Sequence, residues 1–149
     1  MTDQRRKAKL RRFLRLLLAV TLGVIWINSM LPREESAAIS QGLTAWLRSI
    51  GVPIRDDHLL RKLAHFGEFC LLGCELTLLF WLRSGLSFQN LSNAAFCALL
   101  TAVTDESIQF FSGRGSMVMD VVLDFSGALT GILLTGLLLR KATKKADPR

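Results

Sequence analysis

Four long apolar runs constrain the fold of this chain more than any other feature. They cover residues 13–31, 63–82, 91–111 and 117–139. An α-helix rises about 1.5 Å per residue, so roughly 20 residues cross the ~30 Å hydrocarbon core of a bilayer. The mean hydropathy is +0.36 although 21% of the residues are charged, so the charges are segregated from the apolar runs. We predict one all-α domain over residues 1–149, an integral membrane four-helix bundle.

The segment between the first two runs has a different pattern. Ile39, Leu43, Trp46, Leu47 and Ile50 recur at helical spacing, with polar residues between them. This pattern is typical of a short amphipathic helix that lies in the headgroup plane, with a tryptophan as an interfacial anchor. We therefore expect a fifth, non-spanning helix outside the bundle.

The basic residues predict the orientation. The chain has 19 Lys and Arg against 12 Asp and Glu, and most of the excess lies at its two ends. Seven basic residues, the last of them Arg15, lie before or at the start of the first run, and five follow the last. Such clusters mark cytoplasmic ends and contact anionic lipid headgroups, so we do not assign them to nucleic-acid binding. We predict a multi-pass protein of the inner membrane with both termini in the cytoplasm, which four spans allow.

This topology brings nine polar or ionisable residues to the extracytoplasmic face. They come from the second, third and fourth runs and the turn before the fourth: Lys62, His65, Glu68, Asp105, Glu106, Gln109, Arg114, Asp120 and Asp124. Residues three or four apart share one helix face. Each ionisable group inside a membrane costs about 2.5–3.5 kcal/mol on insertion scales. The set therefore favours a functional site, although ion pairs that clamp the bundle remain an alternative.

The residue types indicate two roles within this set. The candidate ligand-binding residues, which would hold a phosphate or carboxylate, are Lys62, His65, Gln109 and Arg114. The candidate catalytic residues, as acid/base groups or ligands of a divalent metal, are Glu68, Asp105, Glu106 and Asp120. Paired carboxylates and basic groups suit both chemistries. His65 and Glu68 alone are a weak zinc pattern, so the sequence identifies no particular metal or cofactor.

Two further features lie deeper in the runs. Glu75 is isolated near the bilayer centre, and we interpret it as a hydrogen-bonding group between helices. Gly127 and Gly131 form a GxxxG pattern, which lets a neighbouring helix approach closely. That neighbour is either a helix of this chain or a partner in the membrane.

Three of these segments together resemble the VanZ-like family. They are Lys62–Phe69 (KLAHFGEF), Asp105–Gln109 (DESIQ), and Gly113-Arg114 followed by Asp120-Val121 and Gly127. The family pattern is roughly KxxHFxEY, DExxQ and a GR with a later D-V and Gly. The resemblance covers about two thirds of the chain, from the first loop through the fourth run.

The chain departs from the family pattern at a few positions. Phe69 stands where Tyr is frequent, Ile108 where His often precedes the Gln, and Ser112 where Pro is common. The spacing from Gln109 to Arg114 is also shorter by one residue. The candidate site residues are all retained.

The resemblance implies a bacterial inner-membrane protein with a role at the cell envelope. Founding members of the family are linked to resistance to the glycopeptide antibiotic teicoplanin. Our leading hypothesis is that the chain binds or modifies an anionic lipid-linked molecule at the outer leaflet, such as a cell-wall precursor or an anionic headgroup. Two alternatives stay open: a metal-dependent lipid-phosphate hydrolase, and a non-catalytic structural or partner-binding protein. Whether the chain is an enzyme is thus left open.

Overall fold

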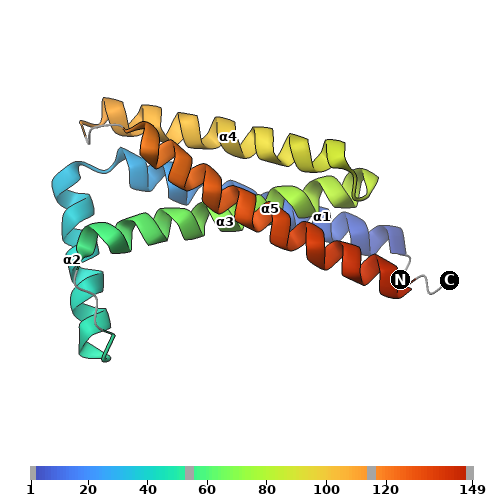
Figure 1. Cartoon of the computed structure of the whole chain (residues 1–149), viewed down its shortest axis with the longest axis horizontal. Helices are drawn as coiled ribbons and strands as arrows, with labels where there is room; N and C mark the ends of the chain where they lie inside the picture. The colour runs from blue at the N-terminus through green and yellow to red at the C-terminus, as the bar shows by residue number, and fades with distance from the viewer. Residues whose placement is uncertain (1–2, 53–55, 114–116, 147–149) are drawn as a thin grey trace.

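A computed structural model describes residues 3–52, 56–113 and 117–146 (Figure 1). Within these ranges the secondary structure is entirely α-helical: α1 Asp3–Met30, α2 Arg33–Ser49, α3 Asp57–Ser84, α4 Phe88–Phe111 and α5 Val118–Ala146. Four of these helices, α1, α3, α4 and α5, are long and apolar enough to cross a membrane. The predicted all-α membrane fold with four spans is confirmed. Each predicted span lies within one of these longer helices, apart from residues 31 and 117, which each lie one residue outside.

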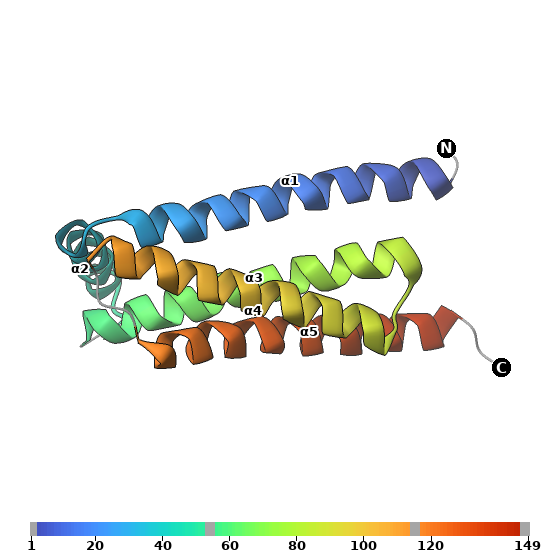
Figure 2. The same ribbon diagram turned by 90° about the horizontal axis from the view of Figure 1, so that it is seen from above.

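The four long helices run side by side, and α2 lies across one end of the bundle (Figures 1 and 2). The α3–α4 connection and both ends of the described chain lie at the opposite end. We call these the α2 end and the terminal end. An even number of spans accounts for the two termini sharing one end, as the charge pattern predicts.

The α3 helix is the centre of the bundle, since it contacts each of the other four helices. Its closest neighbour is α5, where glycines remove the side chains that would separate the two backbones. A Cβ atom at Gly127 would overlap the backbone oxygen of Phe66, and one at Gly131 would overlap that of Cys70. The close approach predicted from the GxxxG pattern therefore occurs within this chain, against α3. A further partner at these glycines stays a prediction.

The outer surface of the bundle is apolar along much of its length. Leu16 and Ile27 on α1 and Leu133 and Leu138 on α5 are all more than 60% exposed. Contiguous exposed apolar surface of this kind is unfavourable in water but matches the hydrocarbon of a bilayer. The surface thus agrees with the membrane assignment made from helix length.

The α2 helix turns its polar face toward the bundle and its apolar face away. Ser36 and Thr44 are buried, whereas Ile39 and Trp46 are 60% and 58% exposed. The helix begins directly after Pro32, more than one turn before the apolar pattern that predicted it. A helix with this inverted arrangement has its apolar residues free to enter a lipid surface, which supports the interfacial position expected from sequence.

Candidate functional site at the α2 end

The first turns of α3 supply three of the candidate residues. Asp56 caps this helix, because its side chain accepts a hydrogen bond from the backbone N–H of His58 at 2.8 Å. Lys62 Nζ lies 3.2 Å from Asp120 Oδ1 on α5, and His65 Nδ1 lies 3.8 Å from Glu68 Oε2. The predicted face of Lys62, His65 and Glu68 is therefore formed, with acidic neighbours for both basic groups.

Asp105 on α4 is held at both carboxylate oxygens. Ser29 Oγ, at the end of α1, donates a hydrogen bond to Asp105 Oδ1. Gln109 Nε2 donates to Asp105 Oδ2 at 2.7 Å, as four residues on one helix face allow. Ser112 Oγ also donates to the backbone oxygen of Ser29 at 3.0 Å. These bonds tie α1 to α4 and fix the orientation of the Asp105 carboxylate.

Glu106 makes a different contact from the adjacent Asp105. It accepts a hydrogen bond from the backbone N–H of Met117, immediately before α5. A carboxylate at this position satisfies an N–H group that the first turn of a helix leaves unpaired. Glu106 also lines a pocket of about 350 Å³ on the α4–α5 surface, with Phe110 and Val121. The structure therefore gives Glu106 a role in starting α5.

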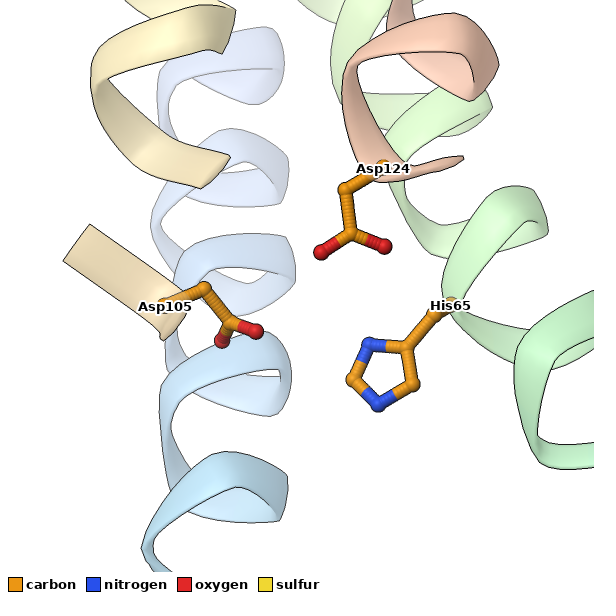
Figure 3. A group of neighbouring side chains, drawn as sticks. All are labelled: His65, Asp105 and Asp124. Atoms are coloured by element: carbon orange, nitrogen blue, oxygen red, sulfur yellow. The ribbon is translucent and has the colours of Figure 1, made fainter. Parts of the chain in front are cut away.

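At the centre of the α2 end, three helices bring His65, Asp105 and Asp124 together (Figure 3). One ligand atom from each residue lies within 4.8 Å of the others. All three side chains are buried, with exposed fractions of 7%, 0% and 2% for the residues in that order. They point toward one another from α3, α4 and α5, with α1 behind them.

The donor set of this group fits a divalent cation. Zinc binds imidazole nitrogens and carboxylate oxygens, and the two carboxylates also suit harder cations such as Mg²⁺ and Ca²⁺. Two ligands of a tetrahedral zinc ion lie roughly 3.4 Å apart, so closure needs only a small side-chain movement. The hydrogen bonds from Ser29 and Gln109 are of the kind that orients a ligating carboxylate.

The predicted residues thus divide into three groups. His65 and Asp105 form the central group, and Glu68 and Gln109 are adjacent to it. Lys62 and Asp120 form an ion pair between α3 and α5, and Glu106 binds the start of α5. Arg114 lies outside the described residues.

Three contributors to this arrangement were not given a role from sequence. Asp124 was predicted to lie at the correct membrane face, but its burial beside His65 depends on how the helices pack, which the sequence pattern does not show. In the sequence, Ser29 and Thr21 are only polar interruptions of an apolar run. Membrane-spanning helices tolerate such interruptions. Thr21 Oγ1 donates to Glu75 Oε1 at 2.9 Å, so the interpretation of Glu75 as a hydrogen-bonding group between helices is confirmed.

The fold and the site together define a multi-pass membrane protein with a buried polar group at one end of its bundle. The model of the VanZ/LLP1 family matches residues 10–139. The chain therefore belongs to the VanZ/LLP1 family, as the three motifs indicated. No curated protein and no solved structure matches the sequence.

Proposed function

We propose that this protein binds or modifies an anionic lipid-linked molecule at the outer leaflet of the bacterial inner membrane. The observation that supports this most directly is the convergence of His65, Asp105 and Asp124 from three helices. Burying such groups in a membrane costs about 2.5–3.5 kcal/mol each by insertion scales, which a role in ligand binding would explain.

The charge balance of the site suggests how it would receive an anion. Its described members include five carboxylates but only one side chain with a permanent positive charge, Lys62, which already pairs with Asp120. An anionic headgroup would be repelled by this set alone. A divalent cation held by His65, Asp105 and Asp124 would neutralise the two aspartates and offer a positive centre to a phosphate oxygen. Arg114 is proposed as an additional contact to the headgroup.

The α2 helix suggests how a lipid-linked molecule would reach the site. Its buried polar residues face the bundle, while Ile39, Trp46 and Ile50 are exposed on the other side. Anchored in the headgroup layer by this apolar face, α2 would hold the site at the depth of lipid phosphates.

A second candidate function, metal-dependent hydrolysis of a lipid phosphate, is favoured by the same three residues. A bound cation acts as a Lewis acid on a phosphoryl oxygen. Glu68 is the candidate proton acceptor, because its Oε2 lies 3.8 Å from His65 Nδ1 next to the group. Binding without turnover and hydrolysis differ only in the fate of the lipid, so one experiment separates them.

The test uses native mass spectrometry of the full chain in detergent with Zn²⁺ or Mg²⁺ and a polyisoprenyl phosphate. We expect the wild type to retain metal and lipid, and Asp124→Asn to lose both by tenfold or more. Glu75→Gln is the matched control, since it neutralises a buried carboxylate of the same bundle outside the site, and it should behave as wild type. Release of inorganic phosphate would select the hydrolase. Retention in Asp124→Asn, or binding by neither protein, would favour the structural role.

A link to teicoplanin resistance is part of the proposal. Expression of the wild type in a susceptible Gram-positive host should raise the inhibitory concentration of teicoplanin, and expression of Asp124→Asn to the same level should not. An equal rise with both proteins would separate resistance from the site.

A further inference from the structure

A second polar feature lies at the terminal end, far from the site described above. Between α1 and α3 is a pocket of about 390 Å³ whose charged lining consists of Arg11, Arg15 and Arg83. Arg11 and Arg15 are four residues apart and therefore share one face of α1. Among the residues that the structure describes, none that lines this pocket is acidic. Three guanidinium groups without a carboxylate among them form a site for an anion, and their planar forks suit phosphate oxygens.

The remainder of the pocket is apolar. Leu76, Leu79 and Phe80 of α3 and Leu18 of α1 form this wall. A soluble anion makes no favourable contact with such a wall, whereas the acyl chain of a lipid packs favourably against it. The pocket thus combines the two recognition elements that match a phospholipid.

The depth of the arginines agrees with this interpretation. Arg83 lies 21 residues after Lys62 on α3, which corresponds to about 31 Å along the helix axis. This length equals the hydrocarbon thickness of a bilayer, ~30 Å. With the α2 end at one headgroup layer, the arginines therefore lie at the other. A phosphate held there would place its acyl chain toward the bilayer centre, along Phe80 and Leu76.

We propose that this pocket binds one anionic phospholipid, with its phosphate on the arginines and an acyl chain against the apolar wall. Basic pockets between spanning helices at the cytoplasmic side are a known mode of anionic lipid recognition. The inference is independent of the proposed function, because the two sites share no residue and lie at opposite ends of the bundle.

The experiment measures lipid binding to the delipidated full chain by native mass spectrometry in detergent. Phosphatidylglycerol and phosphatidylcholine with identical acyl chains are compared. The pocket variant is Arg15→Gln with Arg83→Gln. The control is Arg12→Gln with Arg140→Gln, which removes the same charge from the same end but from residues that do not line the pocket. Size exclusion and thermal unfolding verify that each variant is folded.

We expect phosphatidylglycerol to bind the wild type more tightly than phosphatidylcholine. In the pocket variant its affinity should fall about tenfold or more, as the loss of two arginine contacts implies, and in the control less than twofold. Soluble glycerol 3-phosphate should not displace the lipid. An equal loss in both variants would show that net charge alone attracts the lipid. Unchanged binding in the pocket variant, or displacement by glycerol 3-phosphate, would likewise overturn the proposal.

Discussion

The two ends of the bundle differ in the sign of their charged side chains and in how those side chains are held. At the α2 end, carboxylates are buried, and other groups of the chain hold them: Ser29 of α1 and Gln109 of the same helix for Asp105, and the N–H of Met117 for Glu106. At the terminal end, arginines surround an open pocket with an apolar wall. Groups of the chain itself hold the first set, whereas we propose that the second set binds a phospholipid.

This difference follows from the side chains available to each end. Short carboxylates reach only neighbouring helices, so they persist in a membrane when protein groups satisfy them. Arginine has a long apolar stem, which lets its guanidinium reach the headgroup layer. Excess positive charge at the terminal end also predicts that this end faces the cytoplasm. The α2 end would then face outward, where we propose that the lipid-linked ligand binds.

The largest expected effect comes from separating α3 from α5, because both ends depend on α3. Gly131→Leu would force a side chain into the backbone of Cys70. We expect a loss of about 3 kcal/mol or more in unfolding free energy, since backbone cannot move aside as a side chain can. Metal and phospholipid binding should both fail in this variant. Thermal unfolding in detergent, followed by tryptophan fluorescence, measures the effect.

Gly136→Ala is the control for this prediction. It adds a methyl group to the same helix, where the nearest atom to a new Cβ is Leu91 Cδ2 at 3.6 Å, an ordinary contact. Its unfolding midpoint should match the wild type. A stable, ligand-binding Gly131→Leu protein would show that the contact between α3 and α5 is not needed to hold the two ends.

The sequence predicted the fold better than it predicted the site, and the reason is physical. Span length and charge placement are local properties. The apolar runs of about 20 residues therefore predicted the four helices, and the flanking basic residues predicted that both termini lie at the same end of the bundle. Pairing depends on the rotation of each helix about its axis, which no single run determines. Glu106 and Asp105 are adjacent, yet one binds the start of α5 and the other joins His65 and Asp124. The signal available for Asp124 was its spacing of four residues from Asp120.

Removal of metal should affect the α2 end only. A ligand present at 100 times its dissociation constant stabilises the folded state by about 2.7 kcal/mol. Addition of a chelator to metal-loaded wild type should therefore lower its unfolding midpoint, while phosphatidylglycerol binding at the terminal end is retained. His65→Ala should start from the lower midpoint and not respond to the chelator. Identical responses of the two proteins would argue against a metal on His65.

In the metal-free protein, loss of the Asp105 carboxylate should have an effect of comparable size. Asp105→Ala leaves the Ser29 hydroxyl and the Gln109 amide without their acceptor in a buried place. An unsatisfied buried polar group costs about 1–3 kcal/mol. Ser29→Ala in the same background should recover part of the loss, because it removes one of the stranded donors. If the double variant were less stable than Asp105→Ala by the full effect of Ser29→Ala alone, the two side chains would not be coupled.

The smallest effect is expected at the ion pair between Lys62 and Asp120. This pair lies at the α2 end, but it is partly accessible, as the arginines of the terminal end are. The two side chains are 36% and 27% exposed, and their charged atoms are 3.2 Å apart. Partly exposed pairs contribute roughly 0.2–1 kcal/mol, so Lys62→Met should lower the unfolding free energy by no more than that. High salt should reduce the difference between variant and wild type, since exposed charges are screened. If Lys62→Met nevertheless abolished binding of the polyisoprenyl phosphate with little change in stability, Lys62 would belong to the ligand site. An accessible basic residue would then bind an anion at each end of the bundle.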